Sequence, residues 1–350
     1  MKNTGLLRLL NGSLFLGVLM ISACEKEEIK IPENKNEYIE GAVWIAKWKN
    51  DKKAVVMLEF DDSTPGQATL GVPALNSRNM KGTWYVNPGR EEFQSNINTW
   101  ENIAPAGGQE LANHTMTHTG ASTYEEVVYE VGDAAKKIWE IRGEEMYGSL
   151  MAFNRGGGTS WNEEDLAKVL VDFYNIDRES KIGVPVTALT VLPGSNAETM
   201  YSIVPQAVAD GNIARLHFHG ITATNGNPPK DYGNGAVLIN ELESFLDNLN
   251  SKKDEIWIGG FIQVYKYIME KKASTISLFK GSETQYTIEL QTELDVKYYN
   301  EPLTVIACLP LDWTSCKISY NGNQKNCEIK DGFLIFEVEP DAGSISVVKN

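Results

Sequence analysis

Apolar and polar positions follow two different patterns along the chain. From about Trp44 to Lys272, short apolar runs alternate with amphipathic stretches. The run at residues 53–60, KAVVMLEF, is apolar on both faces, which is typical of a strand inside a parallel sheet, and KGTWYVN at 81–87 is similar. Further strands are predicted at 148–154 and 213–221, and helices at 123–143, 240–252 and 261–273. This alternation predicts a parallel sheet or a barrel, with functional side chains at the carboxyl ends of its strands.

Beyond about Ala273 the pattern changes to short alternating strands separated by turn residues. These strands are predicted within residues 274–281, 286–294, 303–310, 316–340 and 344–350. The sequences YNGNQKN and KDG, at 320–326 and 330–332, are typical of hairpin turns. We therefore expect an α/β domain over residues 44–273, followed by a small antiparallel β-sandwich over residues 274–350.

The N-terminus has the pattern of an export signal. Lys2 and Arg8 precede the apolar stretch SLFLGVLMISA, which runs directly into Cys24. The ending ISAC resembles the lipobox of bacterial lipoproteins, in which the cysteine becomes the first mature residue and carries lipid. Residues 1–23 are then a signal peptide and residues 24–43 a charged tether. The resemblance implies an exported lipoprotein anchored to the membrane at Cys24; the alternative is a soluble secretory signal in which this cysteine is incidental.

Charge and cysteine content narrow the picture further. The formal net charge of the 350 residues is -15, which argues against nucleic acid as a partner because phosphates would repel such a surface. Apart from Cys24, the cysteines are Cys308, Cys316 and Cys327, so at most one disulfide can form among these three. No cysteine spacing indicates a thiolate metal site.

The candidate chemistry lies in two aspartates and four histidines. Asp61 and Asp62 end the apolar run at 53–60, where a simple turn is the alternative reading. The chain has only four histidines, and they form the two tight pairs NHTMTH and LHFHG. Neutral imidazole is the commonest metal ligand, and a carboxylate added to two imidazoles leaves coordination positions open for water and substrate. The sequence thus favours a catalytic metal site over a structural one.

The order of these motifs resembles the polysaccharide deacetylase family, the NodB-homology or family 4 carbohydrate esterase group. EFDDS at 59–63, HTMTH at 114–118 and LHFHGI at 216–221 follow in the order of that family, and the resemblance covers roughly residues 44 to 272. WIAKWKNDKKAVVMLEFDD and KGTWYVN look like the family's first two strands. The resemblance implies a distorted (β/α) barrel of the NodB-homology type.

The resemblance also assigns roles by position. The family's two adjacent aspartates act as general base and metal ligand, and they match Asp61 and Asp62 respectively. Its H-[ST]-x-x-H motif supplies two metal-binding histidines, which match His114 and His118. A divalent metal is therefore expected, with zinc first and cobalt or nickel as alternatives.

The late histidine of the family acts as general acid and matches His219 best. His217 would lie two residues earlier on the same strand face, as a supporting group beside the site, and the opposite assignment of the two histidines stays open. The family's third motif has an arginine that orients the catalytic aspartate, and its nearest match here is Arg155 in AFNRGGGTSW. Glycines replace the rest of that motif, so a surface loop with Arg155 paired to a carboxylate is the alternative.

These assignments imply a metal-dependent hydrolase that removes N- or O-linked acetyl groups from an oligo- or polysaccharide. Two departures support a second hypothesis. The third motif is altered, and the family's Asp–Trp pair cannot be placed, since LDW at 311–313 lies in the predicted β-domain. The alternative is a surface glycan-binding lipoprotein that keeps the metal site but has lost turnover.

Overall fold

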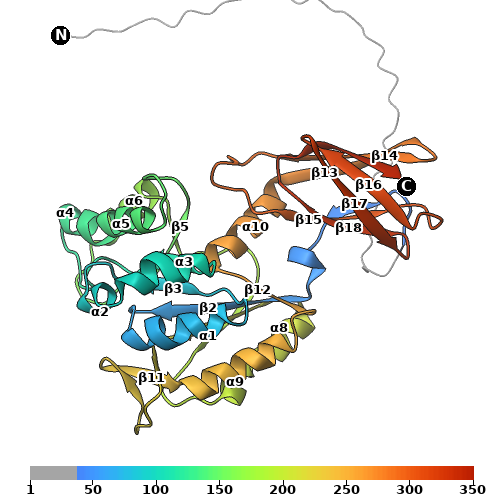
Figure 1. Cartoon of the computed structure of the whole chain (residues 1–350). Helices are drawn as coiled ribbons and strands as arrows, with labels where there is room; N and C mark the ends of the chain where they lie inside the picture. Colours follow the sequence, from blue (N-terminus) through green and yellow to red (C-terminus); the bar gives the residue numbers. More distant parts are fainter. Residues whose placement is uncertain (1–37) are drawn as a thin grey trace, which may run out of the picture. The chain divides into compact units, whose positions relative to one another are not determined.

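The computed structural model describes residues 38–350 (Figure 1). The expected signal peptide, Cys24 and most of the expected tether lie outside these residues. The last part of the tether region differs from the expectation, because Tyr38, Ile39 and Ala42 pack with Trp44 in a small hydrophobic cluster. Among the described residues no helix is both long and apolar enough to cross a membrane.

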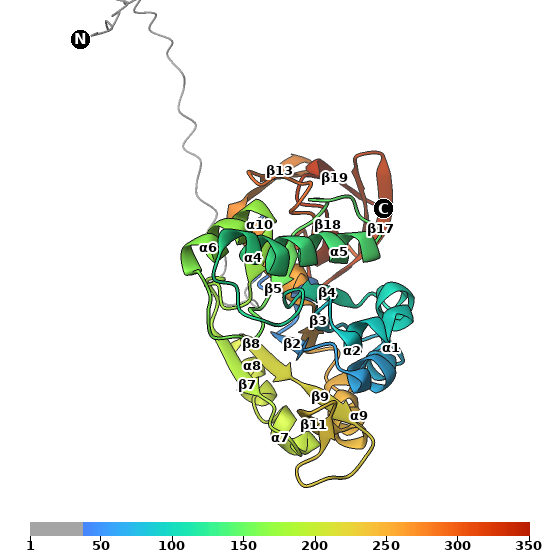
Figure 2. The same cartoon turned by 90° about the vertical axis from the view of Figure 1, so that its left-hand side faces the viewer.

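The first domain is built on a parallel sheet, as the alternating pattern predicts. The order of its strands is β6-β5-β4-β3-β2-β8-β7, and every pairing along it is parallel. The strands are β2 (Ala54–Asp61), β3 (Thr83–Val86), β4 (Glu110–Asn113), β5 (Met151–Phe153), β6 (Asn175–Asp177), β7 (Val186–Thr190) and β8 (Ile213–Phe218). β6 and β7 end the path without pairing to each other, so the barrel is open. Figure 2 is turned so that the viewer faces the side toward which β2 points in Figure 1.

The central strand β2 shares one of its edges between two neighbours. Its first residues pair with β12 (Ile256–Ile258), and its last residues pair with β3. All eight residues of β2 are buried, which explains its apolar character on both faces. Its side chains alternate between the faces: Leu58 and Phe60 belong to one core cluster, whereas Met57 belongs to the other. Asp61 therefore points to the same face as Met57.

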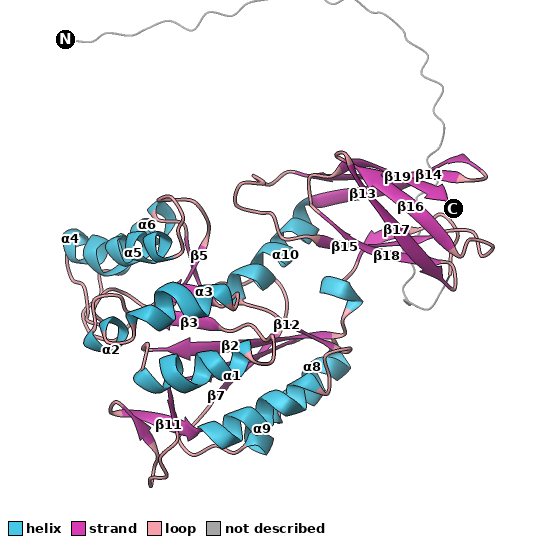
Figure 3. Cartoon of the chain, in the orientation of Figure 1, coloured by secondary structure: helices cyan, strands magenta, loops and turns pink. Residues whose placement is uncertain are grey.

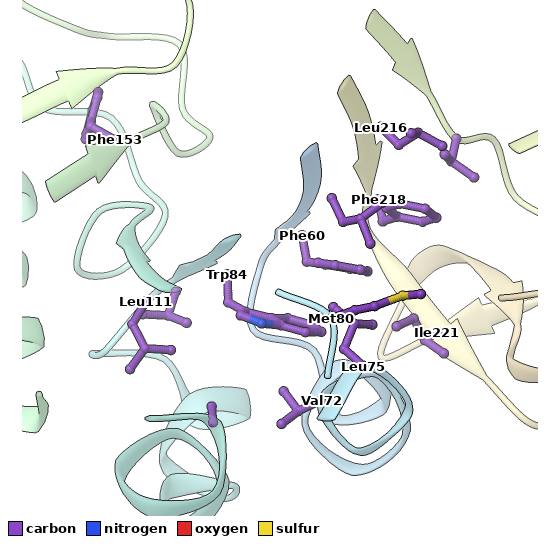
Figure 4. Close-up of a cluster of buried hydrophobic side chains, with 14 of the residues drawn as sticks. Phe60, Val72, Leu75, Met80, Trp84, Leu111, Phe153, Leu216, Phe218 and Ile221 are labelled. Carbon is purple, nitrogen blue, oxygen red and sulfur yellow. The ribbon is translucent and has the colours of Figure 1, made fainter. Parts of the chain in front are cut away.

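Helices cover both faces of the sheet. The face that carries Phe60 is covered by α1 (Val72–Asn76), α2 (Glu91–Gln94), α3 (Ala104–Ala106), α4 (Tyr124–Val127), α5 (Ala134–Ile141), α6 (Glu163–Asp172), α7 (Ala197–Tyr201), α8 (Val204–Asp210) and α9 (Ile239–Asn250), whereas α10 (Phe261–Ala273) packs on the face that carries Met57. In the core beneath several of them the ring of Phe60 stacks on Trp84 and on Phe218, with centroids 4.1 and 4.8 Å apart (Figure 4). This packing fixes β2, β3 and β8 relative to one another, and with them the residues that follow each strand.

The long helix predicted at 123–143 is present as α4 and α5 joined by a wider helical turn at Val128–Asp133. Thr123 begins it with a capping box, because its side chain accepts from the backbone of Glu126 and the Glu126 side chain accepts in return. Gly143, with φ of +68°, follows its end. The helices predicted at 240–252 and 261–273 correspond to α9 and α10.

The second domain is antiparallel, as predicted, and Figure 3 shows its strands with no helix among them. Its order is β1-β15-β18-β17-β16-β19-β14-β13, and the two ends of this path contact each other. The strands are β1 (Val43–Ile45), β13 (Ser274–Ser282), β14 (Gln285–Thr292), β15 (Leu303–Cys308), β16 (Ser315–Tyr320), β17 (Asn323–Lys330), β18 (Phe333–Val338) and β19 (Gly343–Lys349). They form a nearly closed barrel rather than two separate stacked sheets.

One boundary differs from the sequence expectation. β1 pairs antiparallel with β15, so Val43–Ile45 lies in the sheet of the second domain rather than in the first domain, where the expected start at Trp44 put it. Three residues give too short a pattern to reveal their partner. The two predicted hairpin turns are present: Asn321 and Gly322, and likewise Asp331 and Gly332, have positive φ between paired strands.

Candidate active site

The predicted site residues follow the carboxyl ends of neighbouring parallel strands. Asp61 ends β2, His114 follows β4, Asn154 follows β5 and His219 follows β8. Because all of these strands are parallel, their ends meet at one edge of the sheet. Two groups of possible ligands gather there: Asp62 with His114 and His118, and Asp61 with His217 and His219; within each group the ligand atoms lie within 4.8 Å of one another.

The first group has the form expected of a metal site. Oδ1 of Asp62 lies 3.4 Å from Nε2 of His114 and 3.1 Å from Nε2 of His118. Nδ1 of His114 lies 2.9 Å from the carbonyl oxygen of Asn154. A carbonyl can only accept, so Nδ1 carries a proton, and Nε2 is the nitrogen that faces Asp62.

This arrangement fits a bound cation. Oδ1 of Asp62 is buried and accepts no hydrogen bond of good geometry, although the Nε2 atoms of both histidines face it. A buried carboxylate needs a compensating cation, and a metal ion held by these three side chains would supply one. Ligand atoms at bond lengths of about 2.0–2.2 Å around a tetrahedral zinc ion are about 3.3–3.6 Å apart, close to the spacing found here. Asp62, His114 and His118 are therefore a candidate Asp–His metal site.

Backbone with positive φ shapes both loops that carry these ligands. Asp62 and Ser63 have φ of 82° and 49°, and Thr115 and His118 have φ of 72° and 63°. Such values are uncommon for residues other than glycine and persist only where the surroundings enforce them. The His114–His118 segment is thus a loop rather than a helical turn. The hydroxyl of Ser63 accepts a hydrogen bond of 2.8 Å from the backbone N–H of Asn87, which ties the loop after β2 to the end of β3.

Buried polar side chains fix the loop that carries the two candidate metal-ligating histidines, His114 and His118. The side chain of Asn87 donates to the carbonyl oxygens of His114 and Thr115. Glu130, almost fully buried, accepts from the backbone N–H of Thr117 at 2.9 Å and from its hydroxyl. Since these acceptors and donors are all engaged, the loop is held at both of its ends.

Asp61 is surrounded by three donors. Its Oδ2 accepts from Nδ2 of Asn154 at 2.7 Å and lies 2.7 Å from Nε2 of His217, and its Oδ1 accepts from Nη1 of Arg178 at 3.0 Å. Burial by itself would raise the pKa of Asp61, but the imidazoles of His114 and His217 and the Arg178 guanidinium outweigh it and hold this pKa well below its usual range. Asp61 is therefore a fixed carboxylate beside the candidate metal ligands.

The structure corrects the expectation for Arg155. Its Nη1 pairs with Oε1 of Glu163 at 2.6 Å, and its side chain is 48% exposed, so it does not orient Asp61. The preceding residue, Asn154, and the distant Arg178 make those contacts instead. Arg178 follows the short strand β6, and its backbone N–H donates to the carbonyl of Phe153. The sequence offered no sign of Arg178, since NIDRES resembles no motif and β6 has three residues.

The glycines after Arg155 pack against the histidine loop. A Cβ on Gly156 would lie 2.6 Å from Oγ1 of Thr115, and a Cβ on Gly157 would lie 2.6 Å from Cε1 of His118. Gly158 has φ of +97°, and a Cβ on it would lie 2.1 Å from the backbone nitrogen of Gly120. Three consecutive residues thus need to lack a side chain for the two loops to touch. This explains the altered motif as a packing surface.

The two later histidines differ in their contacts. His217 lies within β8, and its Nε2 contacts Oδ2 of Asp61, as described above. His219 is half-buried beside it, with ring centroids 4.6 Å apart, and burial together with His217 lowers the pKa of His219. The buried amide of Gln67 donates to the carbonyl oxygens of both Asp61 and His219. One side chain therefore connects the end of β2 to the end of β8.

A second link joins the loop after β2 to the small sheet of β9 (Gly220–Thr222), β10 (Lys230–Asp231) and β11 (Asn234–Leu238). The Asp231 carboxylate accepts from the backbone N–H of Gly66 at 3.0 Å and from that of Ile221 at 3.3 Å. A Cβ on Gly66 would lie 1.6 Å from the carbonyl oxygen of Ile221. Gly66 is thus required by close approach and not only by the turn.

Part of the chain is similar to known proteins. Residues 49–163 match the family model described as polysaccharide deacetylase. This segment contains Asp61, Asp62, His114 and His118, whereas His217 and His219 lie beyond it. The chain is also 22% identical over 343 residues to a gellan lyase from a Bacillus species. That alignment covers 88% of this chain but only 13% of the lyase.

Solved structures of family 4 carbohydrate esterases are also similar, at low identity. One is a family 4 acetyl xylan esterase from Clostridium thermocellum in complex with a cobalt ion, 18% identical, with a TM-score of 0.40 over 60% of this chain and 90% of that one. Another is a family 4 carbohydrate esterase from Bacillus subtilis, 14% identical, with a TM-score of 0.38 over 62% and 81%. A family 4 pseudoenzyme from Bacillus anthracis is 13% identical, with a TM-score of 0.39 over 62% and 66%.

Proposed function

We propose that this chain, whose residues 49–163 belong to the polysaccharide deacetylase family, is a metal-dependent hydrolase that removes N- or O-linked acetyl groups from an oligo- or polysaccharide. One observation carries the proposal. Oδ1 of Asp62, which is buried and accepts no hydrogen bond of good geometry, faces the Nε2 atoms of His114 and His118, and the fixed carboxylate of Asp61 lies beside it.

Asp62, His114 and His118 would hold the metal, with zinc as the first candidate and cobalt or nickel as alternatives. A divalent ion bound there supplies a Lewis acid that polarises a carbonyl and lowers the pKa of a water molecule. The protein's own contribution is the fixed tautomer of His114, which the carbonyl of Asn154 sets.

Asp61 is the proposed base, which accepts the proton of the attacking water. Asn154 and Arg178 fix the direction of its two oxygens, and His217 holds the same oxygen as Asn154. Such positioning keeps a reacting group near its productive geometry, where a displacement of 1 Å costs about 10²-fold in rate. His217 is therefore proposed as a positioning residue.

His219 is the proposed general acid, which donates a proton to the departing amine or alcohol. Its carbonyl is fixed by Gln67, whereas its ring makes no hydrogen bond among those found in the described residues. A ring that is half-buried and not engaged by Asp61 is the one able to reach a leaving group. General-acid assistance of this kind contributes about 10²–10⁴-fold.

Acetate release tests the proposal. Purified protein is incubated with acetylated xylan and with chitooligosaccharides, with and without a chelator, and compared with Asp61→Asn. We expect acetate from one substrate class, abolished by the chelator and by the substitution. Metal content of His114→Ala and His217→Ala gives a separate measure: His114→Ala should lose the metal, and His217→Ala should keep it. No metal-dependent acetate from either class would contradict the enzymatic assignment.

A glycan-binding protein without turnover is the second candidate. The observation in its favour is that three donors engage Asp61 and depress its pKa, which makes the carboxylate a weak base. In that case the same oligosaccharides bind, as measured by calorimetry, and the metal is retained, but no acetate appears.

We also propose that the chain is exported and anchored to the membrane through lipid on Cys24. The support is the order of Lys2, Arg8, the apolar stretch and ISAC in the sequence. In a bacterial host, the wild type should incorporate labelled palmitate and sediment with membranes. Cys24→Ala should do neither, and label in that variant would contradict the assignment.

A further inference from the structure

Two cysteines of the second domain lie directly opposite each other. In the antiparallel pairing of β16 with β17, Cys316 is in register with Cys327. Directly opposed residues of antiparallel strands have Cα atoms about 4.5–5.5 Å apart. Disulfides span Cα separations of about 4.4–6.8 Å, so the backbone already meets the requirement for a bridge without moving.

The two side chains also point the same way. Opposed residues on neighbouring strands project from the same face of a sheet. Cys316 and Cys327 belong to one hydrophobic cluster, together with Ile318 and Ile329 from the same two strands. Both thiols are buried, and burial together with the nearby Cys327 raises the pKa of Cys316 to about 12.

Cys308 is in a different place. It is in register with Phe333 of β18 and belongs to the separate cluster that contains Trp44 and Ile306. Neither of the other two cysteines lies opposite it. Among the three cysteines of the described residues, Cys308 is therefore the one left over.

We propose that Cys316 and Cys327 form an intramolecular disulfide when the chain folds in the presence of a disulfide oxidant. The two thiols give up two protons and two electrons, and one S–S bond forms between them. The oxidant, for example oxidised glutathione, takes up both and is cleaved to two thiols. The bridge links β16 to β17 across their hairpin and restricts the unfolded chain.

A bridge in this hairpin would stabilise a strand that has a short register with one of its neighbours. β17 connects the two parts of the barrel, but its register with β18 extends only from Ile329 opposite Leu334 to Lys330 opposite Phe333. Its register with β16 extends over six residue pairs. A bond at the Cys316–Cys327 end of that register fixes β17 next to this short contact. The proposal is independent of the catalytic site.

Peptide mapping of the wild-type full chain tests the bond directly. The protein is unfolded under reducing conditions, refolded with a couple of reduced and oxidised glutathione, alkylated and digested. Trypsin alone leaves Cys308 and Cys316 in one peptide, because no lysine or arginine separates them. Adding endoproteinase Asp-N, which cleaves before Asp312, yields peptides 298–311, 312–317 and 326–330, each with one cysteine.

We expect peptides 312–317 and 326–330 to be joined and to separate on reduction, with 298–311 recovered alkylated. Two alkylated peptides, or a link from 298–311 to either one, would overturn the proposal. The melting temperature gives the second measurement. A reductant should lower it in the wild type and in Cys308→Ser, the matched control, but leave it unchanged when Cys316→Ser and Cys327→Ser are combined. A reductant effect that persists in the combined variant would contradict the assignment.

Discussion

Nη1 of Arg178 lies 3.0 Å from Oδ1 of Asp61, although 117 positions separate the two residues in sequence. The guanidinium also lies 3.7 Å from the buried Glu59 carboxylate and packs over the ring of Tyr85. The orientation of the proposed base thus depends on a residue that follows β6, a strand at one end of the sheet.

Replacing Arg178 should impair catalysis more than replacing Arg155. Arg178→Ala removes a contact that orients Asp61, so we expect kcat to fall by about 10²-fold with little change in KM. Arg155→Ala removes only an exposed ion pair with Glu163, worth about 0–1 kcal/mol of stability, and should leave kcat unchanged. Steady-state kinetics of acetate release compare the two. Equal losses in both variants would show that Arg178 has no special role.

Asn154 allows the base and the metal site to be separated experimentally. Its side chain donates to Asp61, whereas its backbone carbonyl accepts from His114. Asn154→Ala deletes only the first contact, so kcat should fall while the affinity for the metal stays constant. Metal titration followed by kinetics on the loaded protein measures both. A loss of metal affinity like that of His118→Ala would contradict the separation.

Gly157 should tolerate no side chain. In Gly157→Ala the new methyl would lie 2.6 Å from His118, so the loop must shift and metal affinity should fall, by analogy with about 10–100-fold losses caused by changes around other metal ligands. Gly281→Ala in the second domain meets nothing closer than 3.4 Å and serves as the control. Metal content after dialysis against a weak chelator distinguishes the two. Full retention of metal in Gly157→Ala would refute the packing role of the glycines.

Glu59 should make stability depend on pH. It is fully buried, neither oxygen accepts a hydrogen bond, and burial raises its pKa to about 8 against the opposing charge of Arg178. In the unfolded chain a glutamate has a pKa of about 4.3. Between these values the folded state holds a proton that the unfolded state has lost, so this group lowers stability as pH rises.

Glu59→Gln removes that dependence. The free energy of unfolding of this variant relative to wild type should therefore increase from about pH 5 to about pH 8. Urea denaturation at the two pH values provides the measurement. The control is the same substitution at an exposed glutamate, Glu163→Gln, which is compared with wild type in the same way. A difference that is the same at both pH values would mean that Glu59 is ionised in the folded protein.

The sequence was most informative where a motif coincides with a strand end. Asp61, Asp62, His114 and His118 follow strands whose apolar runs or spacing could be recognised, and the structure brings them to one edge. Arg178 could not be found in this way, because its strand has three residues and its partner Asp61 is remote.

Arg155 was assigned by its place in a motif, but its side chain turns toward Glu163 in the following helix. Contacts of this kind depend on the direction of a side chain after a loop, which spacing does not specify. The glycines that follow Arg155 are required because they pack against Thr115 and His118. This contact with a loop distant in sequence becomes visible only in the structure.

The amide of Gln67 has a consequence for motion. By holding the carbonyls of Asp61 and His219 together, it makes the ends of β2 and β8 move as one body. Thermal displacement of either strand end is then shared by both proposed proton-transfer groups, so their separation stays nearly constant while the surrounding loops fluctuate. Separating these two strand ends therefore requires breaking a hydrogen bond of that amide in addition to the pairing of β2 with β8.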